Sequence, residues 1–128
     1  MVNYDAFYSS DIWRLSKVSD EELNFWVMVV ENNWQKEAHP QRMNLTFLGG
    51  NTAHWDIADE IETIPDYCRD SELYKTIANE NNIVTKITKS YGFEDEWESI
   101  SRRMVSAAYD QKEGRSICLA YIAMHMGE

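Results

Sequence analysis

The sequence predicts an α+β fold, in which helices pack on a small antiparallel sheet. Two observations carry this prediction: apolar residues recur at helical spacing near both ends of the chain, and segments of alternating polarity lie between them. A chain of 128 residues is expected to form one domain. It buries roughly two-thirds of its unfolded surface, so neither a disulfide nor a metal is needed for folding.

The first clear helix is expected to begin at residue 20. Ser19-Asp20-Glu21-Glu22 forms a capping box, with Ser19 as the N-cap. Residues 23–30 are apolar on nearly every side, which is typical of a helix that is buried or pairs with another molecule. Asn32-Asn33 and then His39-Pro40 are expected to end it. Residues 1–17 are expected to be an arm, and residues 4–16 fit either a short helix or an irregular segment.

The next region predicts a β-hairpin. Residues 42–48 alternate apolar and polar side chains, and residues 52–57 place Trp55 and Ile57 on one face. Gly49-Gly50-Asn51 between them is a turn signal.

The second half predicts two helices, a strand and one ambiguous segment. Asp70 is a suitable N-cap for a helix from residue 71 to about 81, whose buried face would be Leu73, Tyr74, Ile77 and Ala78. Residues 83–89 are rich in β-branched side chains and predict a strand. Residues 94–110 fit a helix, and their start also fits a strand; the longer helical match favours the helix. Gly114 is expected to separate this segment from a closing helix at residues 116–126.

The charge is strongly negative, with 22 acidic against 12 basic residues and a net charge of −10. Such a surface repels phosphate, so direct nucleic-acid binding is disfavoured. It serves solubility, or it imitates nucleic acid and docks on a basic partner. No apolar run is long enough to span a membrane, and the N-terminal residues do not resemble a signal peptide. Cys68 and Cys118 lack metal or redox spacing, so we expect a cytoplasmic protein without a structural disulfide.

Candidate chemistry is weak throughout. His39, His54 and His125 are scattered, and His54 near Asp56 is the best local pair, so no metal or cofactor is expected. Asp56, Asp59 and Glu60 would share a face if their span were helical. Crowding could then raise the pKa of one of these carboxyl groups, which could act as a general acid. A solvated acidic face is the commoner arrangement. No nucleophile elbow and no phosphate-binding loop is present. The sequence therefore does not predict an enzyme.

Three short segments carry a resemblance. Ser19–Leu23, Ile64–Asp70 and Arg115–Ala123 resemble the phage ABA sandwich domain family, related to NinX-like phage proteins. The resemblance implies a bacteriophage or prophage origin and a sheet flanked by helices, but no activity. Each segment also has a structural explanation, because Pro65 fixes an extended entry and Tyr67 packs its ring with the hydroxyl at the rim.

These observations predict a non-enzymatic protein that binds a partner stoichiometrically in the bacterial cytoplasm. The partner would be a host protein with a basic nucleic-acid-binding surface, as expected of an inhibitor of a host defence nuclease or CRISPR-type complex. Alternatives are a phage accessory protein with a phage partner, a protein that binds a nucleotide or other small ligand, and an enzyme whose site is assembled from distant residues. The apolar first helix, with 5 Trp and 7 Tyr in the chain, also suggests a homodimer. The predicted partner-binding residues are Asp56, Asp59, Glu60, Glu62, Asp66, Glu94, Asp95 and Glu96.

Overall fold

The computed structural model describes residues 17–32, 45–55, 59–88, 96–102 and 107–126. The ambiguous segment 4–16, Trp34, His39-Pro40 and Ile57 lie outside them. Within the described residues the chain forms three helices and six strands. In chain order these are α2 (Asp20–Glu31), β1 (Leu45–Gly49), β2 (Thr52–Trp55), β3 (Glu60–Thr63), α3 (Ser71–Glu80), β4 (Val84–Thr88), β5 (Glu96–Ile100), β6 (Ala108–Asp110) and α4 (Glu113–Met126).

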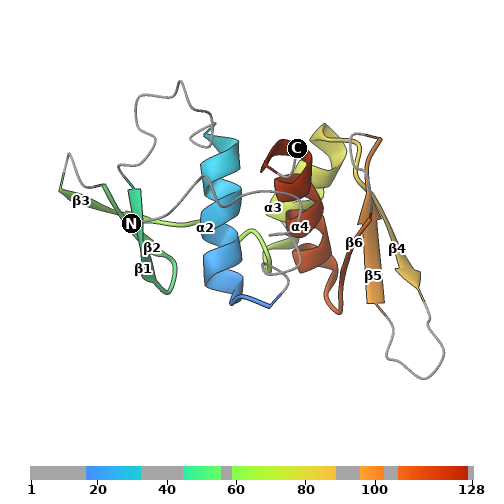
Figure 1. Cartoon of the computed structure of the whole chain (residues 1–128), viewed down its shortest axis with the longest axis horizontal. Helices are drawn as coiled ribbons and strands as arrows, with labels where there is room; N and C mark the ends of the chain where they lie inside the picture. Colours follow the sequence, from blue (N-terminus) through green and yellow to red (C-terminus); the bar gives the residue numbers. More distant parts are fainter. Residues whose placement is uncertain (1–16, 33–44, 56–58, 89–95, 103–106, 127–128) are drawn as a thin grey trace.

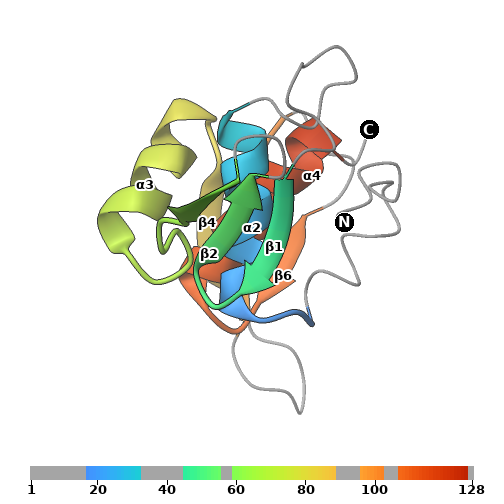
Figure 2. The same cartoon turned by 90° about the vertical axis from the view of Figure 1, so that its left-hand side faces the viewer.

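The elements form an α+β domain with helices at its centre and sheets outside. The strands make two antiparallel three-stranded sheets, β1-β2-β3 (the N-terminal sheet) and β4-β5-β6 (the C-terminal sheet). α2 and α4 pack side by side between them, with the N-terminal sheet beside α2 and the C-terminal sheet beside α4 (Figure 1). Figure 2 shows the N-terminal sheet lying across α2. The predicted class is confirmed, although the strands divide into two sheets rather than one.

α2 forms as its sequence predicts. Ser19 is the N-cap, and its Oγ accepts a hydrogen bond from the backbone N–H of Glu22 at 3.1 Å. The eight residues 23–30 are all buried, because the N-terminal sheet covers one side of the helix and α4 the other. Asn32 ends the helix, where its Nδ2 donates to the carbonyl oxygen of Met28 at 2.8 Å. The apolar surface of α2 is therefore used inside the chain and is not available as a dimer interface.

The predicted hairpin is present, and a third strand joins it. Gly49 and Gly50 make the turn with φ values of 95° and 55°, which glycine adopts without strain. Phe47 packs its ring against Phe25 of α2 with centroids 5.3 Å apart. The sequence did not indicate β3, because acidic residues crowd its span and mask a short alternation.

The preference for a helix over residues 94–110 is wrong, since β5 and β6 occupy this segment. β5 is the central strand, paired with β4 on one side and β6 on the other. The small side chain of Ser99 faces α4: Ser99 is fully buried, and its Oγ lies 2.8 Å from the Oγ of Ser116. Ile100, which the helical pattern would bury, is 41% exposed on the outer face.

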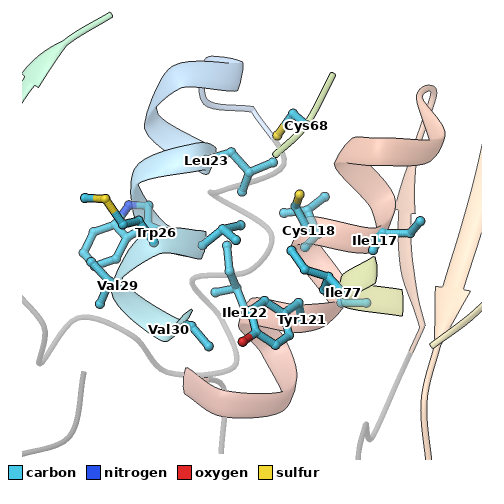
Figure 3. Close-up of a cluster of buried hydrophobic side chains, with 14 of the residues drawn as sticks. Leu23, Trp26, Val29, Val30, Cys68, Ile77, Ile117, Cys118, Tyr121 and Ile122 are labelled. Atoms are coloured by element: carbon cyan, nitrogen blue, oxygen red, sulfur yellow. The ribbon is translucent and has the colours of Figure 1, made fainter. Parts of the chain in front are cut away.

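α3 and α4 complete the core. The Asp70 carboxylate caps α3 at the N–H of Glu72, as expected, but only Ile77 of the predicted face is fully buried. α4 begins at Glu113, so the prediction that Gly114 precedes the helix is wrong. Gly114 instead lies in the first turn of the helix. This position requires glycine, because an added Cβ would overlap the carbonyl oxygen of Cys68 and the ring of Tyr74. Figure 3 shows the core, in which side chains of α2 and α4 meet. None of the helices in the described ranges is long and apolar enough to span a bilayer.

Candidate functional site

The structure separates the predicted partner-binding residues into two groups. Asp59, Glu60, Glu62 and Asp66 lie in or beside β3 of the N-terminal sheet, and Glu96 lies on β5 at the other end of the molecule. Asp56, Glu94 and Asp95 lie outside the described residues. The described members of the two acidic spans therefore do not form one continuous surface.

Asp66 has a structural position. Its Oδ1 accepts a hydrogen bond from Nδ2 of Asn24 at 3.0 Å, and its Oδ2 accepts one from Nε of Arg69 at 2.8 Å. Asn24 is completely buried on α2 and also donates to Oδ1 of Asn51 at 3.2 Å. Its own Oδ1 accepts from the backbone N–H of Cys68 at 2.9 Å. Asn24 therefore joins α2 to the hairpin turn and to the chain that leads into α3.

Asp59 and Glu62 hold the N-terminal sheet together from opposite ends of β3. Oδ1 of Asp59 lies 2.8 Å from Nε2 of His54, and the backbone of Asp59 adopts a positive φ of 52° in the turn before the strand. Oε2 of Glu62 accepts a hydrogen bond from the indole Nε1 of Trp55 at 2.7 Å. These two carboxylates fix the strand and remain at the surface.

Glu60 and Ile61 are the outward features of β3. Glu60 is exposed, and Ile61 is 70% exposed, the highest value among the large apolar side chains in the described residues. β3 pairs with β2 on one side, and no strand of the described ranges pairs with its other side. An exposed edge strand with unpaired backbone groups and an exposed apolar side chain can accept an added strand.

A second candidate site is a polar cavity of about 650 Å³ between the start of α2 and the start of α4. Arg115 lies at its base, with a side chain that is 9% exposed. Its Nη1 donates to Oδ1 of Asp20 at 2.7 Å and its Nε to Oδ2 of Asp110 at 3.1 Å. Burial opposes the charged form of Arg115, but the hydrogen bonds to both aspartates outweigh it and raise its pKa. The remaining lining residues are Lys17, Val18, Ser19, Glu96, Tyr109, Gln111 and Lys112.

Cys68 and Cys118 are buried and form no disulfide. A hydrogen bond with Cys68, together with burial, raises the pKa of the Cys118 thiol well above its ordinary value, so the reactive thiolate is disfavoured. In the part of the chain that the structure describes, no three His, Cys, Asp or Glu side chains are grouped to hold a metal ion.

Sequence reasoning missed Asn24 and Arg115, two buried polar residues that join elements distant in the sequence. Asn24 is the single polar residue in the apolar run 23–30, and that isolation is a usable signal. When a helix is buried on all sides, a polar side chain on it needs hydrogen-bond partners from other segments. Arg115 at the start of an apolar helix gives a similar signal, although nothing local identifies Asp20 as its partner.

A scan against protein-family models, a search of curated proteins and a search of solved structures each gave no match. The fold and the sites thus define a small α+β protein with an acidic edge strand and a polar cavity. The resemblance to the phage ABA sandwich family stays a prediction based on three short segments.

Proposed function

We propose that this chain is a non-enzymatic binding protein that engages a basic partner protein through β3 of the N-terminal sheet. The observation that carries the proposal is Ile61, 70% exposed on an edge strand and flanked by Glu60 and Glu62. A strand added to this edge would gain main-chain hydrogen bonds and would cover the isoleucine.

Charge selects the occupant of this edge. A second copy pairing β3 with β3 would bring glutamates of both strands together, and like charges on paired strands are destabilising. A strand that carries Lys or Arg would instead form ion pairs with Glu60, and the net charge of −10 would attract a basic partner from a distance. The edge thus opposes self-association and favours a basic segment.

For the biological setting we propose a bacteriophage or prophage protein that occupies the basic surface of a host nucleic-acid-handling protein. The choice of a defence nuclease or CRISPR-type complex as the partner is based on the resemblance to the phage family and on the acidity of the chain. A phage accessory role with a basic phage partner would use the same surface.

The experiment immobilises the purified protein and recovers bound proteins from host lysate at rising salt. We expect a basic nucleic-acid-binding protein that is released as salt rises, because screening weakens exposed charge pairs. Ile61→Asp and Glu60→Lys should abolish its recovery. Glu80→Lys, which reverses an exposed charge on α3, is the matched control and should retain it. Equal recovery by Ile61→Asp, or a partner without a basic surface, would refute the proposal.

The cavity beside Arg115 favours one second candidate, a small-ligand function. Its volume of about 650 Å³ falls within the range of ligand sites, and Lys17, Lys112 and Tyr109 offer polar contacts. A thermal-shift screen with nucleotides tests this function, because a ligand that binds only the folded state raises the melting temperature. Stabilisation lost in Lys112→Glu would favour it over the edge-strand proposal.

A further inference from the structure

A groove opens where α3 ends and the C-terminal sheet begins. Its volume is about 790 Å³, and it lies on a different sheet from β3. The lining residues are Asn81, Asn82, Val84, Ile100, Ser101 and Arg102.

The floor of the groove is an apolar cross-strand pair. Val84 on β4 and Ile100 on β5 are register partners, and they are 66% and 41% exposed. Both point away from α4, since Ser99, the neighbour of Ile100, points towards it. Two adjacent aliphatic side chains left open on one face provide a place for a third.

The wall formed by the end of α3 is fixed by hydrogen bonds. The backbone N–H and Nδ2 of Asn81 both donate to the carbonyl oxygen of Ile77, at 3.1 and 2.8 Å. Asn82 adopts a positive φ of 54°, which asparagine tolerates well, and Ile83 N–H donates to Ala78 at 2.9 Å. A groove with a wall held in this way orders few residues on binding.

Arg102 supplies the charge at the rim. Its side chain is exposed, and no described residue forms an ion pair with it. The guanidinium groups of Arg69 and Arg115, by contrast, are each held by aspartates. An exposed arginine beside an apolar floor is suited to bind a carboxylate in a bidentate manner.

The outer edge of β4 lies beside the groove. Among the described strands β4 pairs only with β5, so no described strand occupies this edge. We propose that this groove binds an extended peptide segment of a partner protein, with an aliphatic side chain over Val84 and Ile100 and an adjacent carboxylate on Arg102. Because Val84 is two-thirds exposed, the floor of the groove is shallow, and a shallow groove suits an extended peptide.

The test uses synthetic eight-residue peptides with a central Ile-Asp pair and matched peptides with Ile-Asn, Ile-Lys or Ala-Asp. Fluorescence anisotropy measures their binding to the whole protein. We expect the Ile-Asp peptide to bind, and the Ile-Asn and Ala-Asp peptides to bind about tenfold more weakly. Backbone amide shifts on binding should fall in β4 and around Arg102.

Variants test the assignment of each contact. Arg102→Glu, Arg102→Gln and Val84→Asp should each weaken the Ile-Asp peptide about tenfold or more, whereas Lys75→Glu, an exposed charge reversal on α3, should not. Circular dichroism confirms that each variant is folded, and Ile61→Asp should bind the peptide normally because it alters the other sheet. Failure of the Ile-Asp peptide to bind, tighter binding of the Ile-Lys peptide, or unchanged binding by Arg102→Gln would overturn the proposal. So would self-association in sedimentation that Val84→Asp abolishes, because the occupant would then be a second copy.

Discussion

Asn24 on α2 and Arg115 on α4 are buried polar residues that each join a core helix to a sheet, but they do so by different chemistry. On α2, the neutral amide of Asn24 is completely buried and bonds to Asn51, Asp66 and the backbone of Cys68. On α4, the charged guanidinium of Arg115 is 9% exposed and bonds to Asp20 and Asp110. Asn24 thus ties α2 to the N-terminal sheet, and Arg115 ties α4 to the C-terminal sheet and to the start of α2.

This difference shows where charge can be placed in such a core. Asn24 is surrounded by apolar residues of its own helix, where an uncompensated charge would be very costly. Arg115 lies at the first turn of its helix beside an open cavity, so its charge is partly hydrated and is shared with two carboxylates. The two ends of the molecule should therefore respond differently when each residue is removed.

Removal of Arg115 should have the largest effect. Arg115→Ala removes the guanidinium from the largely buried carboxylate of Asp110 and leaves Asp20 with the more distant Arg69, whose Nε lies 3.8 Å from its Oδ2. It also removes the packing of the Arg115 side chain. We expect a loss of about 3 to 5 kcal/mol in the free energy of unfolding, measured by urea denaturation. Arg115→Lys should recover only part of it, because lysine cannot bond to both aspartates with one planar group. A loss below about 1 kcal/mol would show that the ion pairs are exposed and weak.

Removal of Asn24 should cost slightly less. Asn24→Ala leaves the buried N–H of Cys68 unsatisfied and removes one of the two hydrogen bonds to the Asp66 carboxylate, and we expect a loss of about 2 to 3 kcal/mol. Amide hydrogen exchange should rise first at Cys68 and at the turn containing Asn51. Asn24→Asp keeps the shape but turns the donor into an acceptor facing Asp66, so it should be at least as destabilising. Protection of Cys68 that is unchanged in Asn24→Ala would contradict the role of Asn24.

Sequence could predict the parts of this fold that depend on neighbours along the chain. The caps at Ser19 and Asp70 and the Gly49-Gly50 turn depend on local hydrogen bonds and local backbone angles, and all three are confirmed. The span 94–110 depends instead on distant contacts: Ser99 is buried only because Ser116 lies across from it. Local periodicity could not contain that information.

The candidate sites divide in the same way. Runs of acidic residues are visible in a sequence, so Glu60 and Glu62 could be proposed as binding residues. The edge position of β3, the pairing of Val84 with Ile100 and the cavity above Arg115 arise from strand order and from helix packing. None of these has a spacing in the sequence that could reveal it.

Ser19, the N-cap of α2, directly precedes Asp20, the partner of Arg115. Its removal should have a moderate effect on stability. Ser19→Ala removes the acceptor for the N–H of Glu22, at a cost of about 1 kcal/mol in the free energy of unfolding. Because Asp20 follows the cap and binds Arg115, a loosened first turn should weaken that ion pair. Ser19→Ala and Arg115→Ala together should therefore cost less than the sum of their separate costs. Asp70→Ala on α3 is the matched control, with a similar single cost but no such coupling. A double-mutant cycle on unfolding free energies distinguishes the two caps.

The smallest effect is expected at Tyr67, in the segment that Asn24 holds. Burial, together with the nearby Glu31, raises the pKa of Tyr67 to about 12 in the folded protein, against 10.0 for an unperturbed tyrosine. The unfolded chain therefore loses this proton first as pH rises, so the contribution to stability is complete below pH 10 and disappears by about pH 12. Tyr67→Phe cannot titrate, and its stability should fall less steeply across this window. Since Tyr67 is half-buried, the difference between the two curves should be about 1 kcal/mol. Burial also raises the pKa of Tyr121, so the variant will still lose some stability as pH rises. If the free energy of unfolding, measured by urea denaturation at each pH, falls equally in wild type and in Tyr67→Phe, the whole effect belongs to Tyr121.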